Sequence, residues 1–70
     1  LMSGAGSMAM MFSDVRLKKN VQFQSVYKGR YWYTWEWIWG GVGSGVIAQE
    51  NLDIAVRHPS GYLMVDYGRI

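Results

Sequence analysis

The sequence contains no cysteine and only one histidine, His58. Without cysteine the chain can form neither a disulfide nor a thiolate zinc site, and one imidazole is too few for a structural metal site. We therefore expect no metal and no other cofactor. Small domains without disulfides or metals usually gain their extra stability from a partner subunit.

Long hydrophobic runs are absent too, because the longest one falls far short of the roughly 20 residues of a membrane-spanning helix. No basic residue precedes an apolar segment at the start of the chain, so we expect neither a membrane span nor a signal peptide. The chain opens on Leu1 rather than Met, which predicts a piece of a longer protein.

An excess of charge of one sign is also missing, since seven Lys and Arg residues face five Asp and Glu residues. Apart from Lys18 and Lys19, the basic residues are scattered. Nucleic-acid-binding proteins normally carry a basic stripe, so we expect no nucleic-acid partner.

What the chain has in excess is apolar and aromatic surface. Half of its 70 residues are hydrophobic and 16% are aromatic. A domain of this size buries only about 60% of the surface that its unfolded chain exposes. The sequence therefore predicts one domain that covers its remaining apolar surface by forming an oligomer.

The strongest structural signal is the aromatic segment YWYTWEWIW at residues 31–39. Alternation with period two among aromatic and β-branched side chains predicts a β-strand. We expect its wholly aromatic face to be buried as core and subunit interface, formed by Tyr31, Tyr33, Trp35, Trp37 and Trp39. The alternative is an aromatic platform on which a sugar or single-stranded nucleic acid stacks.

The segments around this strand predict an α+β fold with a small antiparallel sheet and one or two short helices. A helix at 49–56 follows from Leu52, Ala55 and Val56, at spacings of three and four. The glycine-rich segment 40–45 predicts a turn, and it lacks the lysine and long helix of a phosphate-binding loop. We further expect a strand ending at 26–27, a turn at 28–30, a strand at 46–48, a turn at 59–61 and a strand at 62–67.

Ser13 and Lys18 are the candidate catalytic pair, because a lysine can serve as the base for a serine nucleophile. Five residues on an ideal helix correspond to about 500°, so the two side chains would point about 140° apart. They can therefore meet only if Ser13 lies outside a regular helix, or if another chain supplies the partner.

Three sequence blocks carry a resemblance to a known family. They are SDVRLKKNV at 13–21, GVIAQE at 45–50 and GYLMVDYGRI at 61–70. In this order they resemble the S74 peptidase family, the C-terminal intramolecular chaperone domain of phage tail spikes and tail fibres, in a compact form. The aromatic strand lies where that family has a Tyr- or Trp-containing strand, so the likeness covers about residues 13–70.

The resemblance implies an intertwined homotrimer that aligns the upstream fibre domain of the same chain, in the virion tail. Residues 1–12 would be the end of that fibre or a linker, and residues 13–70 the chaperone domain. Ser13 would be the nucleophile, Lys18 the base, and the bond between Phe12 and Ser13 the cleavage site, which would release the domain into the host cytoplasm. The alternative is an uncleaved fibre tip that stays in the virion as a structural cap or receptor contact.

Overall fold

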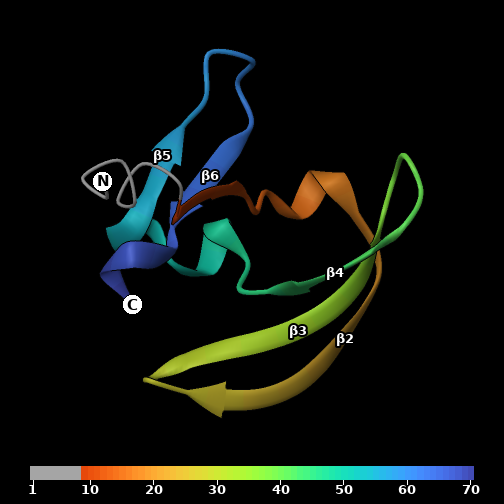
Figure 1. Cartoon of the computed structure of the whole chain (residues 1–70), viewed down its shortest axis with the longest axis horizontal. Coiled ribbons are helices and arrows are strands. Elements are labelled where there is room, and N and C mark those ends of the chain that lie inside the picture. The colour runs from red at the N-terminus through yellow and green to blue at the C-terminus, as the bar shows by residue number, and fades with distance from the viewer. Residues whose placement is uncertain (1–8) are drawn as a thin grey trace, which may run out of the picture.

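The computed structural model describes residues 9–70, in which six strands form two three-stranded antiparallel sheets (Figure 1). One sheet has the strand order β1-β6-β5 and the other the order β2-β3-β4. Most of the segment expected to be a linker or fibre end, residues 1–12, lies outside the described residues. The strands are β1 (Met10–Phe12), β2 (Lys18–Tyr27), β3 (Arg30–Trp37), β4 (Val42–Gly45), β5 (Ala55–Arg57) and β6 (Leu63–Asp66).

The long β2–β3 hairpin confirms the predicted aromatic strand and the strand before it. Its two-residue turn consists of Lys28 and Gly29, both with positive φ, as tight hairpins with right-handed strand twist require. The pairing register shifts twice along β2, between Lys19 and Gln22 and again between Phe23 and Ser25. Such irregularities bend a strand, and Figure 1 shows the hairpin as a wide arc.

Strand β4 corrects the expectation of a turn across the whole glycine-rich segment. Within that segment only Gly40 and Gly41 belong to the turn, which begins at Ile38. The next four residues pair with β3, with Gly43 opposite Trp35. A Cβ on Gly43 would lie 2.6 Å from Trp35 Nε1 and 2.9 Å from Trp37 Nε1. Glycine is therefore required here because two indole rings pack against the backbone, and not because the chain turns.

The predicted α+β class is wrong, because residues 9–70 contain no α-helix and the fold is mostly antiparallel β. The expected helix at 49–56 is interrupted at Asn51, whose backbone is not helical, with φ −140° and ψ 51°. The buried Asn51 side chain donates to the carbonyl oxygen of Ile47 and accepts from Arg30, which offers the chain an alternative to helix. The helical segments are 3-10 turns at Val15–Leu17, Ala48–Glu50, Leu52–Ile54 and Tyr67–Arg69.

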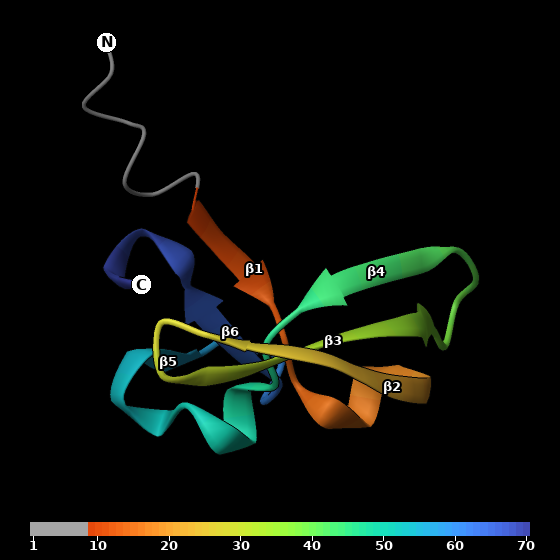
Figure 2. The ribbon, with the colours of Figure 1, turned by 90° about the horizontal axis from the view of Figure 1, so that it is seen from below.

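The hydrophobic core lies between the two sheets. Figure 1 shows the β2–β3 hairpin curving below the β1-β6-β5 sheet, with the segment between β4 and β5 running between them. Figure 2, seen from the hairpin side, shows the hairpin in front of β5 and β6 and the 3-10 turns of that segment at one side. Trp32 of β3 and Tyr67 of the 3-10 turn after β6 pack against this core and against each other. Its fully buried members are Val46, Ala48, Ile54 and Val65.

The aromatic face of β3 is only partly covered within one chain. Trp35 is 4% exposed, whereas Tyr31 is 54% exposed. Trp39, expected on the same strand face, lies instead in the turn after β3, which ends at Trp37, and is 62% exposed. Tyr33 and Trp37 are half-buried. In the described part of the chain no helix has the length and hydropathy needed to cross a bilayer.

Candidate functional site

Ser13 follows β1 directly, and hydrogen bonds from two directions fix its backbone. Its amide donates to the carbonyl oxygen of Leu63 across 3.1 Å, and its own carbonyl oxygen accepts from the Ala48 amide across 2.8 Å. The residue is completely buried. Ser13 therefore joins β6, the segment after β4 and the end of β1 at one point.

Lys18 reaches Ser13 within the same chain. The 3-10 turn Val15–Leu17 lies between them, so Ser13 precedes the turn and Lys18 begins β2. Lys18 Nζ lies 3.3 Å from Ser13 Oγ. The spacing required either that Ser13 lie outside a regular helix or that another chain supply the partner. The structure meets the first condition, because the backbone between the two residues is not a regular α-helix.

The surroundings of Lys18 favour its neutral form. The side chain is 7% exposed, and Nζ lies over the indole rings of Trp35 and Trp37, 4.1 and 5.8 Å from their centroids. Burial lowers the pKa of the Lys18 ammonium from its usual 10.5 to about 8, although the negative charge of Asp14 acts in the opposite direction. A neutral amine, which is what a general base requires, is therefore accessible near neutral pH.

Two further residues complete the hydrogen bonding of Ser13 Oγ, and the sequence did not single them out. The hydroxyl donates to the carbonyl oxygen of Val46, and the phenolic oxygen of Tyr67 lies 3.4 Å away. The Val46 amide in turn donates to that phenolic oxygen across 3.1 Å. Val46 lies in the second block of the S74 resemblance and Tyr67 in the third. Their positions in these blocks are the sequence signal that could have identified them.

Asp14, next to Ser13, holds the surrounding backbone in place through hydrogen bonds to its carboxylate. Its completely buried carboxylate accepts hydrogen bonds from the Arg16 side chain, the Arg16 amide, the Gln49 side chain and the Leu63 amide. The bond from the Arg16 guanidinium is the main reason that the pKa of the Asp14 carboxyl is held well below its usual range. These contacts fix the turn that carries Lys18 back toward Ser13.

Phe12, the other residue of the predicted cleavage site, is the last residue of β1 and lies opposite Met64 of β6. Its half-buried ring packs against the imidazole of His58, with centroids 4.8 Å apart. The Phe12–Ser13 peptide bond therefore joins a paired strand to a buried nucleophile.

The structure brings only part of the predicted aromatic set to this site. Trp35 and Trp37 line the Lys18 side chain, and Trp39 stacks on Trp37 with centroids 4.8 Å apart. Tyr31 packs against Phe23, and the Tyr33 hydroxyl donates to Glu50. Among residues 9–70, no three His, Cys, Asp or Glu side chains gather in a group that could hold a metal ion.

Comparison of the chain with protein-family models, with curated proteins and with solved structures gives no match. Membership of the S74 family therefore stays a prediction that rests on the three sequence blocks.

Proposed function

We propose that this chain is an S74-type intramolecular chaperone domain of a phage tail fibre or tail spike, and that it cuts its own chain between Phe12 and Ser13. The observation that carries the proposal is the buried contact of Lys18 Nζ with Ser13 Oγ, 3.3 Å apart. A desolvated lysine beside a serine hydroxyl is the arrangement of a Ser-Lys dyad. The pKa of Lys18, about 8, suits a base that acts near neutral pH.

The chemistry is an acyl shift followed by hydrolysis. Neutral Lys18 takes the proton from Ser13 Oγ, and the oxygen attacks the carbonyl carbon of Phe12 through a five-membered ring. The bond from that carbon to the Ser13 nitrogen breaks, and the nitrogen takes the proton from Lys18. The resulting ester is hydrolysed by water, which leaves a carboxylate on Phe12 and restores the serine hydroxyl.

The convergence of the three sequence blocks supports the proposal. Ser13 and Lys18 come from the first block, Val46 and Ala48 from the second, and Tyr67 from the third. All of these residues bond to Ser13, although up to 54 positions separate them along the chain. Folding therefore assembles the site, and cleavage would report that the whole domain has folded.

Exposed apolar side chains on the β2-β3-β4 sheet support the proposed homotrimer. Phe23, Val26 and Tyr31 are each more than half exposed, as is Trp39 in the adjoining β3–β4 turn, and Val42 on the edge strand β4 is 82% exposed. Such a surface on so small a domain suits contacts with two further copies of the chain. In this proposal the trimer aligns the upstream fibre, which stays in the virion while the cut domain leaves.

The decisive experiment is denaturing mass spectrometry of the 70-residue chain after folding. We expect a fragment that begins at Ser13, and we expect Ser13→Ala and Lys18→Ala each to abolish it. Matched controls are Ser25→Ala and Lys19→Ala, because these are an exposed serine and an exposed lysine of the same region. An intact wild-type chain after days at pH 9 would contradict self-cleavage and leave an uncleaved fibre tip as the better assignment.

A further inference from the structure

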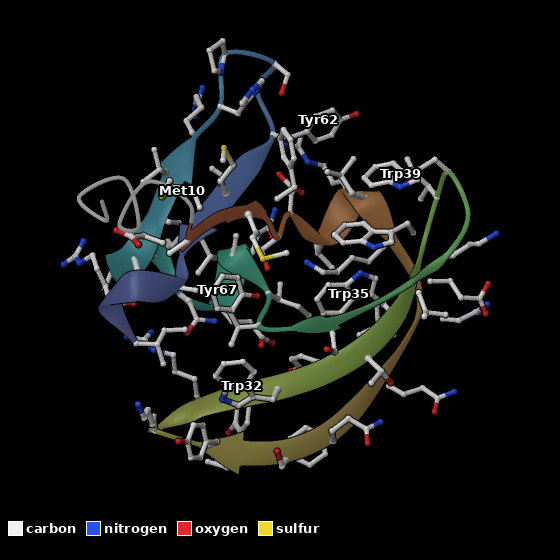
Figure 3. All side chains as sticks on the ribbon, in the orientation of Figure 1. Met10, Trp32, Trp35, Trp39, Tyr62 and Tyr67 are labelled. Atoms are coloured by element: carbon white, nitrogen blue, oxygen red, sulfur yellow. The ribbon has the colours of Figure 1, made fainter. Side chains whose placement is uncertain are left out.

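We infer that Tyr67 is a third catalytic group of the site, which donates its phenolic hydrogen to Ser13 Oγ while that oxygen gives up its proton. The inference rests on the proposed self-cleavage and adds a residue to it. Figure 3 shows Tyr67 on the inner side of the curved β2–β3 hairpin, on the same side as Trp32 and Trp35.

The hydrogen bonds around Val46 determine where the Tyr67 hydrogen points. The Val46 amide donates to the phenolic oxygen across 3.1 Å, so that oxygen acts as an acceptor on this side. Its own hydrogen must point elsewhere, and Ser13 Oγ lies 3.4 Å away. The phenol is thus held in the orientation of a donor toward the nucleophile.

The Ser13 hydroxyl has the complementary arrangement. Its hydrogen is donated to the carbonyl oxygen of Val46, so its two lone pairs are free to accept. Lys18 Nζ lies at 3.3 Å and the Tyr67 hydroxyl at 3.4 Å, and these two donors match the two lone pairs. Val46 contacts both hydroxyls, because its amide bonds to Tyr67 and its carbonyl to Ser13.

This arrangement gives Tyr67 a definite task in the reaction. Once Lys18 is neutral, the Ser13 hydroxyl turns its hydrogen from the Val46 carbonyl oxygen to Nζ, which now accepts it. As that proton moves to Lys18, negative charge develops on Oγ before the bond to the Phe12 carbonyl carbon is complete. A hydrogen bond to an ionised oxygen is roughly twice as strong as one to a neutral oxygen. Tyr67 therefore stabilises the nucleophile most where its charge is greatest, and it keeps its own proton throughout.

The surroundings of Tyr67 hold the ring in this position. Gly45 lies directly against the phenolic oxygen, where any Cβ would collide with it. The ring also packs against Trp32, with centroids 6.1 Å apart. The 3-10 turn that Tyr67 begins is capped by Asp66, whose side chain accepts from the Gly68 amide. A donor held in place before the reaction needs no reorganisation during it.

The test is the pH dependence of the first-order cleavage rate of Tyr67→Phe, which removes the hydroxyl and keeps the ring. We expect the high-pH plateau of the rate to fall about 100-fold, the lower end of the range for loss of one hydrogen-bond donor to a developing oxyanion. The midpoint of the profile should stay near 8, because the surroundings of Lys18 are unchanged. The control is Tyr27→Phe, which alters an exposed phenol and should leave both values unchanged.

Several outcomes would overturn the inference. A Tyr67→Phe rate equal to wild type overturns it alone, provided that Ser13→Ala and Lys18→Ala still abolish cleavage. If the midpoint of the pH–rate profile moves toward 10 in Tyr67→Phe, the substitution has changed the surroundings of Lys18, and Tyr67 has a purely structural role. A wild-type chain that is never cut overturns the proposed function as well. Should Tyr67→Phe fail to fold, the Tyr67 hydroxyl proton of Lys18→Met can be observed by NMR, and absence of a contact with the Ser13 β-protons refutes the inference.

Discussion

The ammonium group of Lys18 lies over the indole of Trp35, with Nζ 4.1 Å from the ring centroid. A cation–π contact of this kind contributes about 0.5–2 kcal/mol. The fall in the Lys18 pKa from 10.5 to about 8 corresponds to roughly 3 kcal/mol against the charged form. The unfavourable burial of the charge therefore exceeds the favourable cation–π contact, so the charged Lys18 side chain lowers the stability of the folded chain.

Replacing Lys18 by methionine should stabilise the fold at pH 7, because methionine keeps the apolar stem and removes the buried charge. We expect a gain of about 1–2 kcal/mol in the free energy of unfolding, since the lost cation–π contact offsets part of the relief. Urea unfolding of Ser13→Ala with and without the second substitution, at equal protein concentration, measures it. The exposed Lys19→Met is the matched control, and a destabilised Lys18→Met would contradict the assignment.

The pH dependence of stability supplies an independent check on the same lysine. The folded-state pKa of about 8 lies below the unfolded value of 10.5, so the unfolded chain binds more protons between these pH values. The stability of Ser13→Ala should therefore rise as the pH increases from 8 to 10.5, and this rise should be absent when Lys18 is methionine. Below pH 8 both states are protonated, and this group adds no pH dependence.

The rate of self-cleavage should follow the neutral fraction of Lys18. Below pH 8 we expect the cleavage rate to increase about tenfold for each pH unit. Above pH 9 the rate should level off, because the Lys18 amine is then almost wholly neutral. Quantitative mass spectrometry over a pH series from 6 to 10 gives the profile. A rate that is independent of pH, or that still rises at pH 10, would remove Lys18 from the role of base.

Asp14→Asn should destabilise the domain by about 2–3 kcal/mol, because an amide turns a donor toward groups that themselves donate to the buried carboxylate. The folded-state pKa of Asp14 is lowered, so its contribution is present above about pH 4 and is lost as the pH falls further. Denaturant unfolding at pH 7 and pH 3 checks both statements. Asp53→Asn, at an exposed ion pair with Arg30, is the control and should cost far less.

Gly45→Ala should impair both stability and cleavage. The added methyl group would collide with the Tyr67 hydroxyl and lie 3.3 Å from the Trp35 ring, at a backbone φ of +149° that favours glycine. We expect a loss of about 1–3 kcal/mol and a slower cut. Gly41→Ala has the same kind of backbone strain with open space around it, so the difference between the two variants measures the collision.

Local sequence patterns predicted the aromatic hairpin and the last strand, but they failed for the strand expected at 46–48, where residues 46 and 47 are irregular and Ala48 begins a 3-10 turn, and for the helix expected at 49–56. The alternation at 31–37 and the Lys28-Gly29 turn are short-range signals, and both appear in the structure as expected. The spacing of Leu52, Ala55 and Val56 fits a helix equally well, yet Leu52 is 69% exposed. The helical periodicity of these eight residues is too weak to hold Asn51 in a helix. Its buried side chain bonds instead to Arg30 and Ile47, which lie outside the segment.

The candidate site was predictable only in part for the same reason. Ser13 and Lys18 are five residues apart, and their chemistry can be read from the residue types alone. Tyr67 lies 54 positions from Ser13, so no local pattern links their hydroxyl groups. The requirement for glycine opposite Trp35 likewise depends on how two indole rings pack across β3 and β4.

Because β1 pairs with β6, cleavage of the peptide bond and dissociation of the two resulting pieces are separate events. A cut after Phe12 breaks one covalent bond, but Met10, Met11 and Phe12 would still lie in register with Asp66, Val65 and Met64. The segment before the cut and the domain after it would then form a nicked complex held by a three-residue ladder. How long the two pieces stay together would depend on the strength of that ladder, so substitutions in β1 would set the lifetime of the nicked state independently of the rate of the cut.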